Sequence, residues 1–246
     1  MIQKYTYILL LLVSFASFAQ EPDKDDGGVV MRRDFLFGLN FNANSGSTGW
    51  GMGFEYGIQK NYKYRRTFGF TLTNIRHPKE FKIYNDLSSS RGYFFGKLNS
   101  LVSFRPTYGG KLVLFQAKRE NGIEITYKWA VGPSIGLVKP VYLKILKFGN
   151  NTVDEQYDPS AHNTENIASR SPWTIGLSEA TLNVGGFFKT GFDFNFSNEK
   201  NKISGGEIGL MVDYFPLKSL HLLNNNPERN LFTSIYLQFN LGQKLY

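Results

Sequence analysis

Cysteine is absent from the 246-residue chain, and histidine occurs only three times. Without cysteine there is no disulfide framework and no thiolate metal site. The same absence excludes a lipid attached to a cysteine behind an export signal. A lipid anchor of that kind therefore does not hold this chain to a membrane.

Long apolar runs are also scarce. Residues 5–18 form one such run, which follows Lys4 and leads to Ala19, with the small residues Ser17 and Ala19 at the −3 and −1 positions of a cleavage site. These features are typical of a secretory signal peptide, so residues 1–19 are predicted to be removed by cleavage after Ala19. Residues 20–33, with the charged stretch EPDKDDGG, are expected to form a flexible lead-in. No later stretch approaches the roughly 20 apolar residues that a transmembrane helix needs.

Aromatic residues and glycine are abundant instead, with 22 Phe, 14 Tyr and 25 Gly. In residues 50–58, WGMGFEYGI, large apolar side chains alternate with small or polar ones. Alternation with period two predicts a strand, because successive side chains leave opposite faces. A soluble strand would carry exposed polar residues on its second face rather than so many glycines. The pattern therefore favours a strand whose small residues face a crowded protein interior.

The same alternation recurs in residues 34–42, 64–74, 93–105, 123–135, 181–196, 207–214 and 234–241. Repeated alternating strands in an exported chain predict an all-β fold, an antiparallel transmembrane β-barrel formed by residues 34–246. About eight strands are expected, an even number typical of small bacterial barrels. Pro106 is expected to end its strand. Residues 111–122 then form either a continuation of that strand or a short surface helix, and a ten-stranded barrel is the alternative.

Three long loops are predicted to lie outside the cell if both termini are periplasmic, namely residues 76–91, 138–179 and 216–229. The loop of residues 138–179 is expected to be irregular. Its run at 141–146, VYLKIL, is nevertheless too apolar for a free loop. That run is predicted to pack on the barrel rim or on another protein.

Charged side chains alternate with the outward residues and are predicted to line the lumen as a charge network. Five are basic and five acidic: Arg65, Lys97, Arg105, Lys128, Lys189, Glu55, Glu124, Asp193, Glu207 and Asp213. Side chains fill the lumen of an eight-stranded barrel, and buried charges need partners. A salt-bridged plug is therefore predicted, and a proton or ion path is the alternative.

The net charge of +8 is assigned to residues outside the lumen, among them Lys60, Lys111 and Lys200 in predicted periplasmic turns. Such residues are expected to meet lipid phosphates or an acidic partner. A nucleic-acid role does not suit an exported chain whose basic residues are spread over turns.

The three histidines, His77, His162 and His221, all fall in the predicted outer loops. Histidine is the side chain best suited to proton transfer near neutral pH, so His77 is the candidate base of a lipid-modifying enzyme. No serine stands beside a histidine in a recognised catalytic pattern. Nothing in the spacing brings the three histidines together, so no metal site is predicted.

The sequence SFAQ at 17–20, the alternating strands and the aromatic C-terminal residue Tyr246 resemble the small outer-membrane β-barrels of Bacteroidota. This class includes OmpA-like barrels and the PorT component of a secretion system. The motifs HPKE at 77–80 and GLVKP at 136–140 are similar to those of one further set within the class. The resemblance covers most of the chain after residue 19 and assigns no functional residues.

The predicted function is that of a non-enzymatic integral outer-membrane β-barrel, a subunit or anchor of a cell-envelope assembly. The alternatives are an enzyme that modifies lipid A or lipopolysaccharide at the outer rim, with His77 as its base, and a small pore. Expected partners are outer-membrane lipid, including lipopolysaccharide, and other envelope proteins. No cofactor, metal or nucleic acid is expected.

Overall fold

A computed structural model provides the fold of the chain. It describes residues 33–43, 48–61, 63–84, 92–115, 122–147, 151–197 and 201–245. The predicted signal peptide, its cleavage site, nearly all of the lead-in and Tyr246 lie outside these residues. The chain divides into two units, Met1–Val30 and Met31–Tyr246, and all described residues belong to the second.

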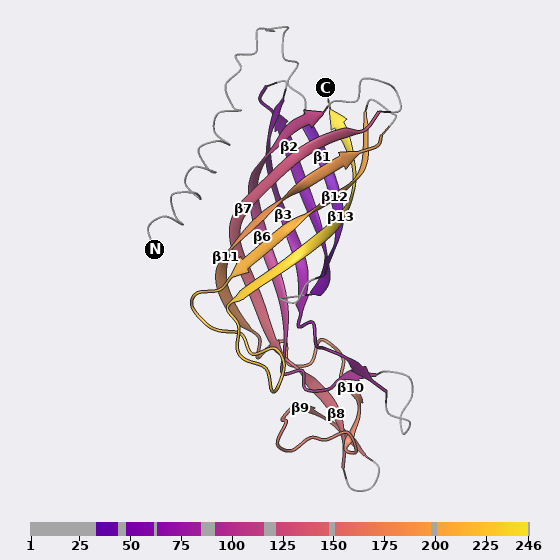
Figure 1. The fold of residues 1–246 in the computed structure, drawn as a ribbon. Coiled ribbons are helices and arrows are strands. Elements are labelled where there is room, and N and C mark those ends of the chain that lie inside the picture. Colours follow the sequence, from indigo (N-terminus) through magenta and orange to yellow (C-terminus); the bar gives the residue numbers. More distant parts are fainter. Residues whose placement is uncertain are drawn as a thin grey trace, which may run out of the picture. The chain divides into compact units, whose positions relative to one another are not determined.

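Eight strands form a closed barrel in which every neighbouring pair is antiparallel. They are β1 (Arg33–Ala43), β2 (Thr48–Gln59), β3 (Tyr64–Arg76), β6 (Asn99–Phe115), β7 (Glu124–Pro140), β11 (Thr181–Asn195), β12 (Lys202–Tyr214) and β13 (Leu231–Leu245). Each strand pairs with the barrel strand before and after it in sequence, and β1 pairs with β13 to close the ring. Figure 1 shows these strands tilted around a common axis.

The period-two pattern of the sequence becomes the two faces of the wall. In β1 the residues alternate strictly between exposed and buried, with Phe37 outward and Leu36 inward. The prediction of an antiparallel barrel with eight strands is confirmed, and the ten-stranded alternative is wrong. Among the described residues, no helix has the length and apolarity needed to cross a membrane.

The prediction that Pro106 ends its strand is wrong. β6 continues through Pro106 to Phe115, which also shows that residues 111–115 continue the strand rather than begin a helix. The register on either side, with Phe104 opposite Ile135 and Tyr108 opposite Val131, sets Pro106 opposite Pro133 of β7. Proline lacks an N–H donor, and placing the two prolines face to face confines the loss to one place in the β6–β7 ladder.

The loop of residues 138–179 was predicted to be irregular, and this prediction is wrong. It contains a three-stranded sheet of β8 (Tyr142–Leu146), β9 (Thr152–Gln156) and β10 (Ile167–Arg170), with β8 in the centre. A separate pair, β4 (Lys82–Ile83) and β5 (Tyr93–Phe94), lies in the connection between β3 and β6. The described residues of 77–98, 141–180 and 215–230 are called the cap below.

The apolar run at 141–146 packs inside this cap. Leu143 and Ile145 of β8 form one buried cluster with Tyr93, Tyr157 and Ile167. The Val141 N–H also donates to the Leu98 carbonyl at 2.9 Å, which ties the run to the connection that precedes β6. The cap therefore has an apolar core of its own, built from segments far apart in the sequence.

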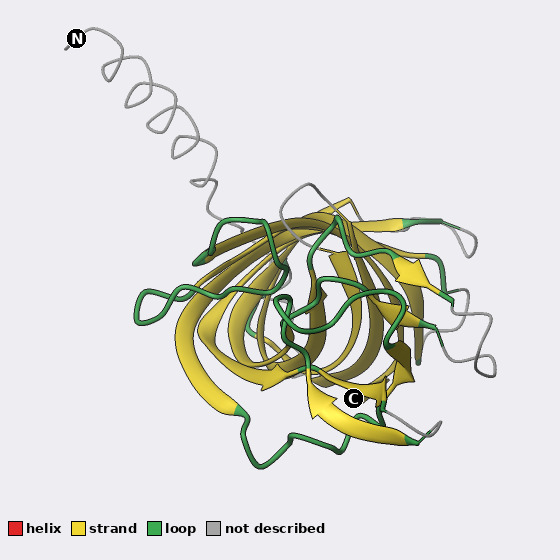
Figure 2. Ribbon diagram, turned by 90° about the horizontal axis from the view of Figure 1, so that it is seen from below, coloured by secondary structure: helices red, strands yellow, loops and turns green. Residues whose placement is uncertain are grey.

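A second apolar cluster seals the barrel at the cap end. Phe215, Leu220 and Leu222 of the β12–β13 connection are buried against the inward residues Ile75, Leu101, Val138 and Phe232 at the strand ends. Viewed from the cap end in Figure 2, connecting segments lie across the mouth of the ring. The strand ends and the connection together close this opening with hydrocarbon.

The proline pair generates a prediction about Gly132. A Cβ atom at Gly132 would lie 2.0 Å from the Pro106 carbonyl oxygen, whereas a Cβ at Gly186 meets nothing nearer than 3.9 Å. We expect Gly132→Ala to destabilise the barrel by about 1–3 kcal/mol, because backbone has to shift to relieve the overlap.

Urea titration of the folded protein in detergent micelles measures this loss. Gly186→Ala is the matched control and should change the unfolding free energy by less than about 0.5 kcal/mol. Equal stabilities of the two variants would show that the β6–β7 contact is looser than described.

Candidate functional site in the barrel lumen

Nine of the ten charged residues predicted to line the lumen lie at inward positions of the barrel strands. They are Glu55, Arg65, Arg105, Glu124, Lys128, Lys189, Asp193, Glu207 and Asp213. On each strand these residues alternate with exposed apolar residues, so the alternation of side-chain direction alone puts the charged side chains in the interior. They form three groups at successive heights in the barrel.

The central group is a chain of alternating charges. Lys128 contacts both Glu55 and Glu207, at 2.6 and 2.9 Å. Lys111 contacts the other oxygen of Glu55 at 2.6 Å, and Lys189 contacts the other oxygen of Glu207 at 2.9 Å. Each carboxylate therefore forms ion pairs with two ammonium groups, which compensates the lost hydration of all five side chains.

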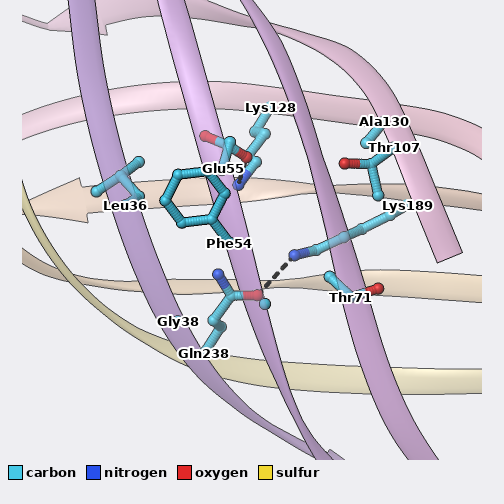
Figure 3. Close-up of a pocket in the computed structure, with 11 residues that line it drawn as sticks. Leu36, Gly38, Phe54, Glu55, Thr71, Thr107, Lys128, Ala130, Lys189 and Gln238 are labelled. Carbon is cyan, nitrogen blue, oxygen red and sulfur yellow. Dashed lines mark hydrogen bonds and ion pairs between the residues drawn. The ribbon is translucent and has the colours of Figure 1, made fainter. Parts of the chain in front are cut away.

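Neutral side chains complete this central group. The Tyr236 hydroxyl donates to Glu207 at 2.6 Å, and Lys189 donates to the Gln238 amide oxygen at 2.8 Å. Asn240 donates to Asp193 at 2.9 Å. Figure 3 shows Lys189 reaching across the interior toward Gln238, with Lys128 beside Glu55. These contacts join side chains from β2, β6, β7, β11, β12 and β13.

Nearer the cap, Arg105 and Asp213 form a bidentate ion pair with distances of 2.7 and 2.8 Å. Arg105 also donates to the Thr73 hydroxyl, and Ser134 donates to Asp213, both at 2.8 Å. Arg105 is 1% exposed and Asp213 2%, so the pair is fully dry. An apolar cluster of Ala130, Phe187, Met211 and Tyr236 lies in the same interior.

At the end opposite the cap, Arg65 lies between Asp34 and Glu124, at 3.5 and 3.4 Å. The Arg65 and Glu124 side chains are each 16% exposed. The longer distances make this group looser than the two groups above it.

Lys97 is the exception among the ten, and its assignment to the lumen is wrong. It precedes β6, lies in the cap and pairs with Glu80 at 2.6 Å. The alternation that placed it inward was extended backward past Asn99, where the strand begins.

Lys111 shows the opposite error. It was assigned to a periplasmic turn, but it is 2% exposed and contacts Glu55 in the lumen. The alternation of Leu112 and Leu114 as outward residues was the signal that would have placed it inside. Asp34 was missed in the same way, although it alternates with Phe35 and Phe37 in β1.

Little space remains between these side chains. A cavity of about 20 Å³ lies beside Glu55, Lys128 and Lys189 (Figure 3), which is room for about one water molecule. The lumen is therefore filled by its own charged side chains at this height.

His77, the candidate base, lies in a structured turn at the end of β3. The ring is buried, its Nδ1 accepts from the Lys79 backbone N–H at 3.2 Å, and the His77 backbone N–H donates to Glu80 at 3.0 Å. Burial lowers the pKa of His77 below its usual 6.5, and the Arg229 charge lowers it further, while Glu80 opposes the shift. The neutral ring accepts a hydrogen bond that shapes the HPKE turn.

The other two histidines have separate surroundings. The His162 ring accepts from the Asp158 backbone N–H at 3.0 Å and lies 3.4 Å from Glu155, and the His221 backbone carbonyl accepts from Asn99. Within the part of the chain that the structure describes, no three His, Asp or Glu side chains are placed to hold a metal ion.

Comparisons with known proteins give general likenesses of fold. No family model and no curated protein matches the chain. Among solved structures, Ail, the attachment invasion locus protein of Yersinia pestis, has 10% identity and a TM-score of 0.42, over 87% of this chain and 99% of that one. The outer membrane protein OprG of Pseudomonas aeruginosa has 7% identity and a TM-score of 0.38, over 88% and 96%. Neisserial surface protein A has 9% identity and a TM-score of 0.36, over 87% and 96%.

The central charge group predicts a large effect of one neutral substitution. Glu207→Gln removes the carboxylate shared by Lys128 and Lys189, so that Lys128 keeps its contact with Glu55 and Lys189 loses its carboxylate contact. We expect a loss of about 3–5 kcal/mol in unfolding free energy, the usual cost of breaking a buried ion pair.

Urea unfolding in liposomes measures this cost. The control is Glu124→Gln, which removes one longer contact of 3.4 Å and leaves Arg65 with Asp34, and it should cost less than about 1 kcal/mol. The double variant Glu207→Gln/Lys189→Met should recover part of the loss, because it also removes one stranded charge. A loss below about 1 kcal/mol for Glu207→Gln would contradict the described pairing.

Proposed function

We propose that the protein is an integral outer-membrane β-barrel whose filled lumen makes it an anchor for its cap rather than a pore. The main support is the outward face of the wall. Large apolar side chains are exposed on every barrel strand, including Phe37, Phe41, Trp50, Phe70, Phe104, Val131, Phe188, Ile208 and Phe239. A soluble protein rarely exposes so large an apolar surface, and a closed sheet satisfies its backbone groups inside lipid.

The filled lumen supports anchoring over conduction. Ion pairs occupy the centre, and Phe215, Leu220 and Leu222 seal the cap end. A steady pore needs a continuous wet path, whereas the cavity beside Glu55, Lys128 and Lys189 in the central lumen has room for about one water molecule. We assign the charge network to barrel stability.

The cap supplies a surface for a protein partner. In its three-stranded sheet β9 pairs only with β8, so one edge of β9 has no strand neighbour among the described residues. Thr152, Val153 and Asp154 on β9 are exposed. Unpaired strand edges and exposed apolar residues favour association, so we propose that this edge meets another cell-envelope protein.

The surroundings of His77 favour a structural role over catalysis. Its ring is 5% exposed and one nitrogen is occupied by a backbone N–H. Among the described residues, its hydrogen bonds are to Lys79 and Glu80 rather than to a serine. We therefore propose a non-enzymatic protein, in which the HPKE turn shapes the start of the cap.

Single-cysteine labelling tests the location and orientation of the barrel, and the cysteine-free chain supplies a clean background. Leu217 is exposed in the β12–β13 connection, and Asn61 is exposed in the β2–β3 turn at the opposite end. In intact cells, a membrane-impermeant maleimide should label Leu217→Cys fully. Asn61→Cys should react only after the outer membrane is permeabilised.

The same cells provide the control for location, since the protein should stay in the membrane pellet after a urea wash. Recovery in the soluble periplasmic fraction would contradict the integral-barrel proposal. Labelling of Asn61→Cys alone in intact cells would reverse the orientation.

Photo-crosslinking tests the partner surface. A photoreactive phenylalanine analogue at Val153, on the edge of β9, should give a light-dependent adduct of higher mass in intact cells. The same analogue at Leu217, exposed on the same side, is the matched control and should give none. Recovery of monomer alone from the Val153 variant would contradict the assembly proposal.

A further inference from the structure

A second, much larger pocket lies outside the lumen, between the barrel and the cap. Its volume is about 460 Å³, within the range of small-molecule binding sites. The ends of β3, β6 and β7 form one wall, and β8 with the segment after β10 forms the other. Barrel and cap thus both contribute to the lining, and most of the lining residues belong to the cap.

Four cationic side chains line this pocket: Arg76, Lys97, Lys139 and Arg170. Among the described residues, Lys97 alone of these has a carboxylate within ion-pair distance, its partner being Glu80 at 2.6 Å. Lys139 is 4% exposed and its ammonium donates to the Pro140 carbonyl at 3.0 Å. The nearby Glu179 is engaged by the Tyr142 hydroxyl at 2.6 Å. The pocket therefore carries more positive than negative charge.

A buried ammonium without a contacting carboxylate loses hydration that a single carbonyl replaces only in part. Burial lowers the pKa of Lys97, opposed by Glu80, and the Arg76 charge lowers it further. The cations in this pocket thus repel one another. An anionic group bound among them would offset both the lost hydration and the repulsion. Phosphate suits a site that combines arginine and lysine.

Aromatic rings accompany the cations. The Lys139 ammonium lies 5.9 Å from the Trp173 ring centre and 6.0 Å from that of Tyr142, and the Arg76 guanidinium lies 5.7 Å from Phe94. Trp173 is 54% exposed. An exposed indole beside a phosphate-binding cation offers a flat apolar surface to the ring of a sugar.

The position of the pocket indicates where its ligand comes from. On β3, Asn74 and Arg76 continue the outward face that carries the exposed Phe70 and Leu72. Residues two apart on one face are separated by about 7 Å. The pocket therefore opens directly beyond the apolar band of the wall, at the height of lipid headgroups if the barrel lies in a membrane.

We propose that this pocket binds the phosphorylated sugar headgroup of a lipid in the outer leaflet of the same membrane. Arg76 and Lys139 hold the phosphate, and Trp173 packs on the sugar ring. The inference rests on the proposed membrane location and adds to it a specific lipid class and site. Lipid bound there bridges wall and cap, which fixes the cap on the membrane surface.

Binding is measured on the full chain folded in detergent micelles, with a phosphorylated glucosamine-disaccharide lipid as the probe and its dephosphorylated form as the comparison. Native mass spectrometry should show binding of the phosphorylated form alone. Arg76→Gln/Lys139→Gln should weaken it about tenfold or more, because two charged contacts are lost. Trp173→Ala, at an exposed position, should weaken it less and keep the preference for phosphate.

The matched control is Lys79→Gln/Lys218→Gln, which removes two exposed charges of the cap outside the pocket and should leave binding unchanged. Circular dichroism verifies that each variant is folded. Equal binding of the two lipid forms, or unchanged binding by both pocket variants, would overturn the proposal.

Glucose 6-phosphate and inorganic phosphate form a third arm and should compete poorly with the lipid. If either binds as tightly, the ligand is a soluble phosphate compound and the lipid assignment is wrong. Because these measurements use detergent-folded protein, their failure leaves the membrane location to the cysteine-labelling result, and the two proposals fail separately.

Discussion

Closure of the sheet by the β1–β13 pairing is the constraint on which the rest of the structure depends. Once the ring is closed, every strand has two hydrogen-bonded neighbours and each side chain faces either the outside or a narrow interior. Charges that face inward can reach only other side chains of the interior. The chain of Lys111, Glu55, Lys128, Glu207 and Lys189 is the direct result. The apolar residues between them in sequence are left on the outer wall.

Alternation in the sequence was enough to predict this wall. It placed Glu55, Lys128 and Glu207 inside because each of them alternates with large apolar residues along its strand. It failed where a strand boundary was misjudged: Lys97 was counted inside although β6 begins at Asn99, and Lys111 was left outside because Pro106 was taken as a strand end. Proline deprives a ladder of one N–H donor, and because Pro106 lies opposite Pro133, the two missing donors fall at one place in the β6–β7 ladder.

The partners of the charged side chains and the fold of the cap could not be predicted from the sequence. Arg105 and Asp213 are 108 residues apart, and nothing local marks them as partners until the barrel register is known. Likewise, the apolar run at 141–146 predicted burial but not its neighbours, since Tyr93 and Ile167 come from other segments. The cationic pocket escaped notice for the same reason: Arg76, Lys139 and Arg170 meet only when the cap folds onto three strand ends.

The double contact of Lys128 has a consequence for assembly. Its partners Glu55 and Glu207 belong to β2 and β12, near opposite ends of the described chain. A partly assembled sheet that lacks β2 or β12 leaves the Lys128 ammonium with one carboxylate contact instead of two, in a medium that excludes water. Lys128, in the middle of the chain, therefore gains both of its carboxylate partners only when strands from both ends of the chain are in place. We therefore expect the barrel to form cooperatively, without a stable intermediate that contains fewer strands.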